Sequence, residues 1–130
     1  MSDFEKRFEV LKRELEGKDE RTRQEALKGF HLDWAKALEA TDPHGALRQY
    51  SLAEDCQWTL GTFSTSGGEG LASMSEVYRL QGLRADVLER QLRFGDALEI
   101  WEGILKDPNG LATLTPAEAR IRALKRKLGR

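Results

Sequence analysis

The stretch RFGDALEIWEGILKDPNG, residues 93–110, decides the fold class of this chain. Its centre is an amphipathic helix expected over residues 97–106, because apolar side chains recur there at the spacing of one helix face. Residues 94–96, Phe-Gly-Asp, predict a tight reversal before this helix, and residues 107–110, Asp-Pro-Asn-Gly, predict its end. The apolar face of the helix consists of Leu98, Trp101, Ile104 and Leu105.

The same helical period extends over most of the remaining chain. Further helices are expected over residues 3–16, 22–40, 43–62 and 116–128, and a longer helix is expected from about residue 71. No segment shows the alternation of β-branched and polar residues that indicates a strand. We therefore predict an all-α fold of six to seven helices, joined as antiparallel helical hairpins.

Glycines decide where the longer helix begins and ends. The stretch GTFSTSGGEG, residues 61–70, is rich in Ser, Thr and Gly and is expected to be a loop. Gly82 lies inside a helical pattern that continues to Leu92, and a glycine there costs about 1 kcal/mol relative to alanine. The sequence leaves open whether this helix is continuous, kinked or broken at Gly82.

Helix starts are indicated by the capping-box pattern, in which Ser, Thr or Asp is followed three residues later by Glu. The two side chains of such a box accept hydrogen bonds from backbone N–H groups that the first turn leaves free. Asp42-Pro43 and Thr115-Pro116 also place a proline at the expected first helical position. The expected boxes are Ser2/Glu5, Thr22/Glu25, Ser66/Glu69, Ser73/Glu76, Asp96/Glu99 and Thr115/Glu118.

Two segments of the chain are similar to each other. GFHLDWAKALEATDPHG, residues 29–45, and DALEIWEGILKDPNG, residues 96–110, each combine a tryptophan-containing amphipathic helix with a terminal Asp-Pro and a polar turn. Trp34 and Trp101 are 67 residues apart, close to two periods of about 34 residues. This pattern resembles the tetratricopeptide repeat, a helical hairpin that stacks into arrays.

The resemblance covers mainly residues 93–110 and 38–50. It implies a right-handed array of hairpins, with Gly95 as the turn glycine, Ala97 as the small packing residue and Pro108 as the helix terminator. An irregular helical bundle remains the alternative, because alternating helices and turns of this kind occur there too. Both arrangements are stacks of helical hairpins.

Length and charge favour one domain with a distinct end. In a chain of 130 residues we expect residues 1–112 to form the helical hairpins and residues 113–130 to form a basic capping helix of the same domain. Residues 111–130 carry six Lys or Arg and one acid, whereas residues 1–110 carry 15 basic and 21 acidic residues. One cysteine and the lack of a long apolar run favour a cytoplasmic protein that does not enter a membrane.

No catalytic constellation is present in the sequence, and we expect neither an enzyme nor a cofactor or metal site. His31 and His44 are expected at the surface or boundary of their helices. Cys56 is expected to be a buried packing residue, because Glu54 and Asp55 beside it would raise the pKa of its thiol. The glycine-rich loop lacks the lysine of a phosphate-binding loop, so we interpret it mainly as a connector.

Binding is the function class that remains, and we predict a protein–protein interaction module of the adaptor or scaffold type with a protein or peptide partner. Trp58 lies off the apolar stripe of its helix, which favours an aromatic contact with that partner. The seam Phe4, Phe8, Leu11 and Leu15 is expected to pack inward or across the axis of a homodimer. The residues expected to bind the partner are Trp58, Tyr50, Arg48, Tyr78 and Arg84.

The basic C-terminal helix has three interpretations. It covers the last hairpin through Ile121, Leu124 and Leu128, it docks on an acidic partner or another copy of the chain, or it contacts nucleic-acid phosphates. The third interpretation gives the alternative function, a nucleic-acid-associated or regulatory protein. The cations concerned are Arg120, Arg122, Lys125, Arg126 and Lys127.

Overall fold

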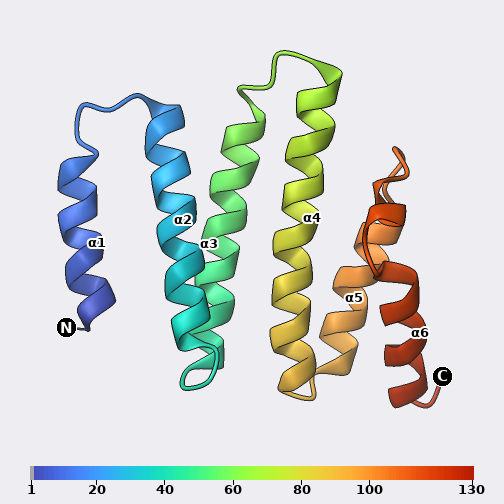
Figure 1. Cartoon of the computed structure of the whole chain (residues 1–130). Helices are drawn as coiled ribbons and strands as arrows, with labels where there is room; N and C mark the ends of the chain where they lie inside the picture. Colours follow the sequence, from blue (N-terminus) through green and yellow to red (C-terminus); the bar gives the residue numbers. More distant parts are fainter. Residues whose placement is uncertain (1) are drawn as a thin grey trace.

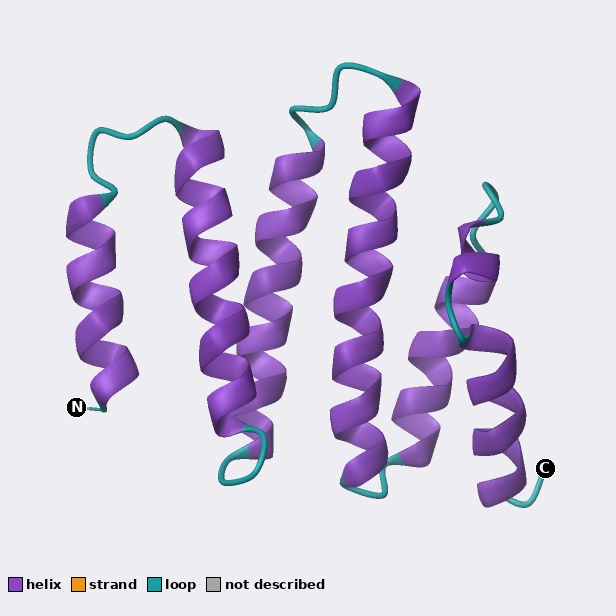
Figure 2. Cartoon of the chain, viewed as in Figure 1, coloured by secondary structure: helices purple, strands orange, loops and turns teal. Residues whose placement is uncertain are grey.

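The computed structural model describes residues 2–130, and over these residues the chain forms only helices, turns and loops (Figures 1 and 2). The observed all-α fold of six α-helices confirms the predicted fold class. One further 3₁₀ turn, η1, precedes the last helix and was not expected from the sequence. The elements are α1 (Asp3–Glu14), α2 (Glu20–Leu38), α3 (Pro43–Gly61), α4 (Gly67–Arg90), α5 (Phe94–Leu105), η1 (Leu111–Leu114) and α6 (Ala117–Lys127).

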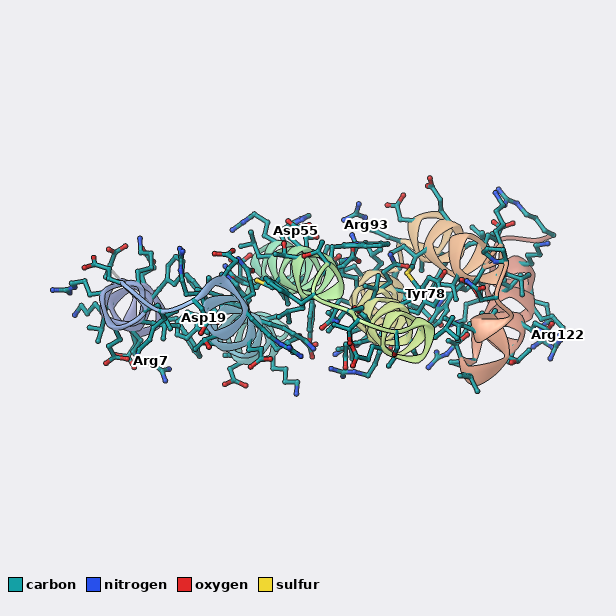
Figure 3. All side chains as sticks on the ribbon, turned by 90° about the horizontal axis from the view of Figure 1, so that it is seen from above. Arg7, Asp19, Asp55, Tyr78, Arg93 and Arg122 are labelled. Atoms are coloured by element: carbon teal, nitrogen blue, oxygen red, sulfur yellow. The ribbon has the colours of Figure 1, made fainter. Side chains whose placement is uncertain are left out.

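The helices follow one another along an extended array. Helices α2 to α6 each pack mainly against the helices next to them in sequence. Seen along the helix axes, α2, α4 and α6 lie on one side of the array, and α3 and α5 lie on the other (Figure 3). This zigzag leaves a groove wherever two helices of the same side flank a helix of the other side.

The main core lies between α4, α5 and α6. Its buried residues form one continuous cluster, which Phe94, Ile100 and Leu128 extend at the edges. A smaller cluster joins α2, α3 and α4 through Ala35, Tyr50 and Val87. The main cluster consists of Tyr78, Ala85, Leu88, Ala97, Leu98, Trp101, Ile104, Ala112, Ala117, Ile121 and Leu124.

Gly82 does not interrupt α4, which runs unbroken from Gly67 to Arg90. Its role is to admit a neighbouring side chain: a Cβ at Gly82 would lie 2.9 Å from Cη2 of Trp101 in α5. The indole is buried, and within residues 2–130 its Nε1 has no hydrogen-bond partner, so packing alone holds it in place. The glycine is therefore the contact point between α4 and α5 rather than a helix break.

Three of the expected capping boxes are wrong. Thr22/Glu25, Ser73/Glu76 and Asp96/Glu99 all lie inside helices, where the same three-residue spacing joins neighbouring side chains on one face. Helix α2 instead begins after Asp19, whose side chain accepts a hydrogen bond from the backbone N–H of Thr22 (2.9 Å).

The remaining helix starts lie at or beside the expected residues. The Ser2/Glu5 box is complete, and Asp42 accepts from the N–H of Gly45 in the first turn of α3. Ser66 caps α4, so the loop is shorter than expected and three of its glycines belong to the helix. At α6 the expectation was one residue early: Pro116 precedes the helix, and the Thr115 hydroxyl accepts from the N–H of Ala117.

The reversal before α5 was placed wrongly. Helix α5 already begins at Phe94, so Gly95 lies in its first turn. The chain turns instead at Leu92, whose φ of 63° puts a leucine in the left-handed region. The Arg93 N–H bonds back to the carbonyl of Leu88, a helix C-terminal closure that usually employs glycine.

Helix α1 is attached by aromatic contacts and has no buried residue of its own. Phe4 stacks on Trp34 with ring centroids 5.8 Å apart, and Phe8 stacks on Phe30 at 5.6 Å. The seam of the first helix thus packs inward on α2, as one of the two expectations held. Leu15, just after α1, is the first buried side chain of the chain.

Candidate docking groove

The groups that carry catalysis in other proteins are internal here. His31 is buried, so its expected place at a helix surface or boundary is wrong, and its Nδ1 donates to Oε1 of Gln49 (2.7 Å). Burial lowers the pKa of His31, and the bond to Gln49 partly opposes this shift. Cys56 is buried as expected, and its burial together with the charge of Asp55 raises the pKa of the thiol to about 11.

Metal binding has no cluster of ligands to support it. Within residues 2–130, no three His, Cys, Asp or Glu side chains are grouped to hold a metal ion. His44, the other histidine, is exposed at the start of α3. Over the same residues no helix is both long enough and apolar enough to cross a membrane.

The two tyrosines expected at the partner-binding face lie inside the array. Tyr50 is 1% exposed and donates to Oε1 of Glu39 (2.5 Å); Tyr78 is 7% exposed and donates to Oδ1 of Asp107 (2.6 Å). Burial and the bonded carboxylate raise the pKa of Tyr78 to about 12. Each hydroxyl ties a helix end or loop to the core, which argues against direct contact with a partner.

The other three expected residues line hollows on the α3/α5 side of the array. Arg48 and Arg84 line a groove of about 730 Å³ that α4 floors between α3 and α5. Trp58, 48% exposed, lines a smaller hollow of about 260 Å³ between α3 and the first half of α4. The apolar residues of the larger groove are Leu47, Leu52, Leu88 and Ile100.

One stripe of α4 runs beneath both hollows. Met74 and Val77 line the smaller hollow, whereas Gln81, Arg84 and Leu88 line the larger one. These positions recur every three or four residues, so they share one face of the helix. With Gly70 at its start, the stripe covers 18 residues, or about 27 Å of helix. We call the two hollows and this stripe the α4 groove.

The sequence did not indicate the apolar residues that make the groove adhesive. Leu52 is 42% exposed at its wall, although leucine is normally a core residue. Its position in the helical pattern of α3, four residues after Arg48, carried a signal, because both lie away from the buried Tyr50, Ala53 and Cys56. Ile100, on the wall formed by α5, needed the structure to be found.

The charges of the α4 groove are only partly neutralised within the chain. Arg84 pairs with Glu54 (3.1 Å) and Arg93 with Asp96 (2.8 Å). Arg48 is exposed and forms no ion pair with any described residue. The bond from Arg84 to the Ser51 hydroxyl is long (3.5 Å), and its Nε has no acceptor within residues 2–130. The guanidinium groups therefore keep donor capacity for an added carboxylate.

The groove on the opposite side of the array is saturated by internal bonds. It lies between α2 and α4, measures about 680 Å³, and is crossed by a polar chain. Lys28 donates to Gln57 (2.8 Å), and the Gln57 amide donates to Ser73 (2.8 Å), which ties α2, α3 and α4 together. Glu76 adds ion pairs to Lys28 and Arg79. Its polar groups already have partners, so this groove is the weaker candidate.

The basic helix α6 divides its cations between two faces. Arg120 pairs with Asp86 (3.6 Å) and Glu89 (3.4 Å) on α4, and Lys127 pairs with Glu89 (3.0 Å). With Ile121 and Leu124 buried, these contacts fix α6 as the end of the array. Figure 3 shows Arg122 pointing away at this end. The exposed cations that form no ion pair with a described residue are Arg122, Lys125 and Arg126.

Comparison with known proteins adds no function. The chain matches no protein-family model, no curated protein and no solved structure. The resemblance to tetratricopeptide repeats therefore stays a prediction, and the function has to be inferred from the groove itself.

Proposed function

We propose that this chain is a non-enzymatic protein-interaction module that receives a segment of a partner protein in the α4 groove. The observation that carries the proposal is an exposed Leu52 and an exposed Trp58 on the walls of hollows along one stripe of α4. Exposed aromatic and apolar side chains beside a concave surface are typical of binding hot spots. A helical-hairpin array of this kind offers a preformed groove and needs little rearrangement to bind.

Each part of the groove has a role in this proposal. Trp58 and Met74 would be covered by apolar side chains of the partner, which removes apolar surface from water. Leu52 and Ile100 form the two apolar walls between which the segment lies. Arg48 contributes charge at the rim, where it affects the rate and the specificity of association more than the affinity.

An affinity capture tests the proposal with matched variants. The tagged full chain, Leu52→Glu and Val10→Glu are each used to capture proteins from a nuclease-treated lysate of the source organism. Val10 is also exposed (47%) but lies on α1, so both substitutions add one negative charge to an exposed apolar position. We expect a partner retained by the wild type and Val10→Glu and lost by Leu52→Glu. Equal retention by all three chains would place binding outside the groove.

A second candidate function rests on the outward face of α6. Arg122, Lys125 and Arg126 are spaced three and four residues apart on an exposed helix surface, which suits contact with phosphates or an acidic partner. We expect such binding, if it occurs, to weaken steeply as salt rises from roughly 50 to 200 mM. Fluorescence anisotropy with a labelled DNA duplex and a single-stranded RNA tests it. No binding at low salt, or binding unchanged by Arg122→Glu with Arg126→Glu, would contradict this candidate.

A further inference from the structure

The two ends of the α4 groove differ in chemistry. At the end beside the first half of α4, the lining includes Trp58, Met74 and Val77 and no charged residue. At the other end the lining mixes apolar and charged side chains. The charged residues there are Arg48, Arg84, Arg93, Asp96 and Glu99.

Positive charge predominates at this second end although the surrounding chain is acidic. Residues 1–110 carry 15 basic and 21 acidic residues, yet three of the five charged residues in this lining are arginines. Arg48 forms no ion pair with a described residue, and the guanidinium of Arg84 keeps an unused donor. Arginine matches a carboxylate with two parallel hydrogen bonds, so this end suits an acidic side chain.

We infer that the segment bound in the α4 groove is amphipathic and polarised, with apolar residues beside Trp58 and carboxylates beside Arg48. This inference rests on the proposed function and adds the chemistry and the direction of the partner. The stripe of about 27 Å fits about 18 residues of helix or about eight residues of extended chain. The acidic end of the segment lies toward the C-terminal end of α4, where Arg84 and Leu88 line the groove.

The polarity follows from the cost of the reverse arrangement. A carboxylate beside Trp58 would lose water without meeting a cation in the lining there. An apolar end beside Arg48 would leave its guanidinium without an acceptor and would cover part of its hydration shell. The reverse orientation is thus disfavoured at both ends, which gives the groove a direction as well as a composition.

A random-peptide display selection on the full-length chain tests the inference. Peptides of about 16 residues, long enough as helices to span most of the stripe, are selected on the wild type. Their affinities are then measured by fluorescence anisotropy for the wild type, Arg48→Glu, Trp58→Ala and Arg122→Glu. Arg122 is an exposed arginine of α6 outside the groove, so its variant controls for the same change in net charge.

We expect enriched peptides with Asp or Glu gathered in one half and apolar residues in the other. Arg48→Glu should weaken their binding about tenfold, which corresponds to about 1.4 kcal/mol, and Arg122→Glu should change it less than about twofold. A nitroxide on the acidic end should broaden backbone NMR signals near Asp96 and not those near Thr62.

Two results would overturn the inference in different ways. Peptides that require Trp58 but lack acidic residues and tolerate Arg48→Glu would leave the groove as a binding site and remove its acidic specificity. A selection that yields no peptide dependent on Trp58 would count against the proposed function itself, and against the inference with it.

Discussion

Trp101 and Trp34 occupy equivalent places in two similar sequence segments, yet their surroundings differ. Trp101 lies within a cluster of eleven buried residues contributed by α4, α5, η1 and α6. Trp34 lies in a partly open group of rings with Phe4, Phe8 and Phe30. Similar amphipathic helices therefore reach different degrees of burial, because α5 is enclosed by neighbours and α2 has only a short helix beyond it. The C-terminal half is the rigid part, and the α4 groove is built on its edge.

The largest expected difference between the two regions comes from truncating a core side chain. Ile104→Ala removes three carbons from a fully buried site and should reduce the free energy of unfolding by about 2–5 kcal/mol. Leu11→Ala, on the half-buried seam of α1, should cost less than about 1.5 kcal/mol because water already reaches the site. Urea denaturation followed by circular dichroism measures both. Equal losses would show that α1 is packed as tightly as α5.

A pair of glycines sharpens the comparison. Gly82→Ala places a Cβ 2.9 Å from the Trp101 ring and should destabilise the fold by about 1–3 kcal/mol despite the better helix propensity of alanine. Gly29→Ala, in the middle of α2, has no side-chain atom within 4 Å of the new Cβ and should stabilise the fold by about 0.5–1 kcal/mol. Thermal unfolding of the two variants gives opposite shifts if the account is right. A stabilising Gly82→Ala would mean that the Trp101 contact is loose.

The smallest expected effect is a pH dependence from His31 in the N-terminal region. Burial lowers the pKa of His31 below its ordinary value of 6.5, so the unfolded chain binds a proton more readily than the folded chain. Stability is unaffected by this group above about pH 6.5 and falls as the pH is lowered toward the folded pKa, by at most about 1.4 kcal/mol per pH unit.

The variant His31→Gln should remove this part of the pH dependence. Urea midpoints are compared at about pH 7.5 and 5.5 for the wild type, His31→Gln and His44→Gln. His44 is exposed and serves as the matched control. A wild-type profile that keeps the same slope in His31→Gln would assign the effect to the carboxylates.

Local patterns in the sequence predicted the helices well and their side-chain partners less well. Apolar spacing located all six helices, because one face of each must be buried. The capping pattern failed at Ser73 and Asp96 because three-residue spacing also occurs inside helices, where it has no capping role. The turn at Leu92 was missed because leucine gives no local signal for a left-handed backbone conformation.

Predictions for the binding face divided according to tertiary packing. Arg48 and Trp58 were identifiable because they lie off the buried stripe of α3. Tyr50 and Tyr78 were not separable from surface tyrosines, because Glu39 and Asp107, which accept from their hydroxyls, lie 11 and 29 residues away in sequence. His31 was misplaced for the same reason, since Gln49 lies on the next helix.

Site-specific photo-crosslinking tests the central claim, that the α4 groove receives a partner protein. A photoreactive phenylalanine derivative is placed at Thr62 and at Glu99, exposed positions that line the two hollows, and at Asp33 and Arg122 as exposed controls outside them. We predict that Thr62 and Glu99 form adducts with the same protein from a nuclease-treated lysate, that Asp33 and Arg122 do not, and that Leu52→Glu abolishes the adducts. Adducts from Arg122 alone, or from none of the four positions, would contradict the claim.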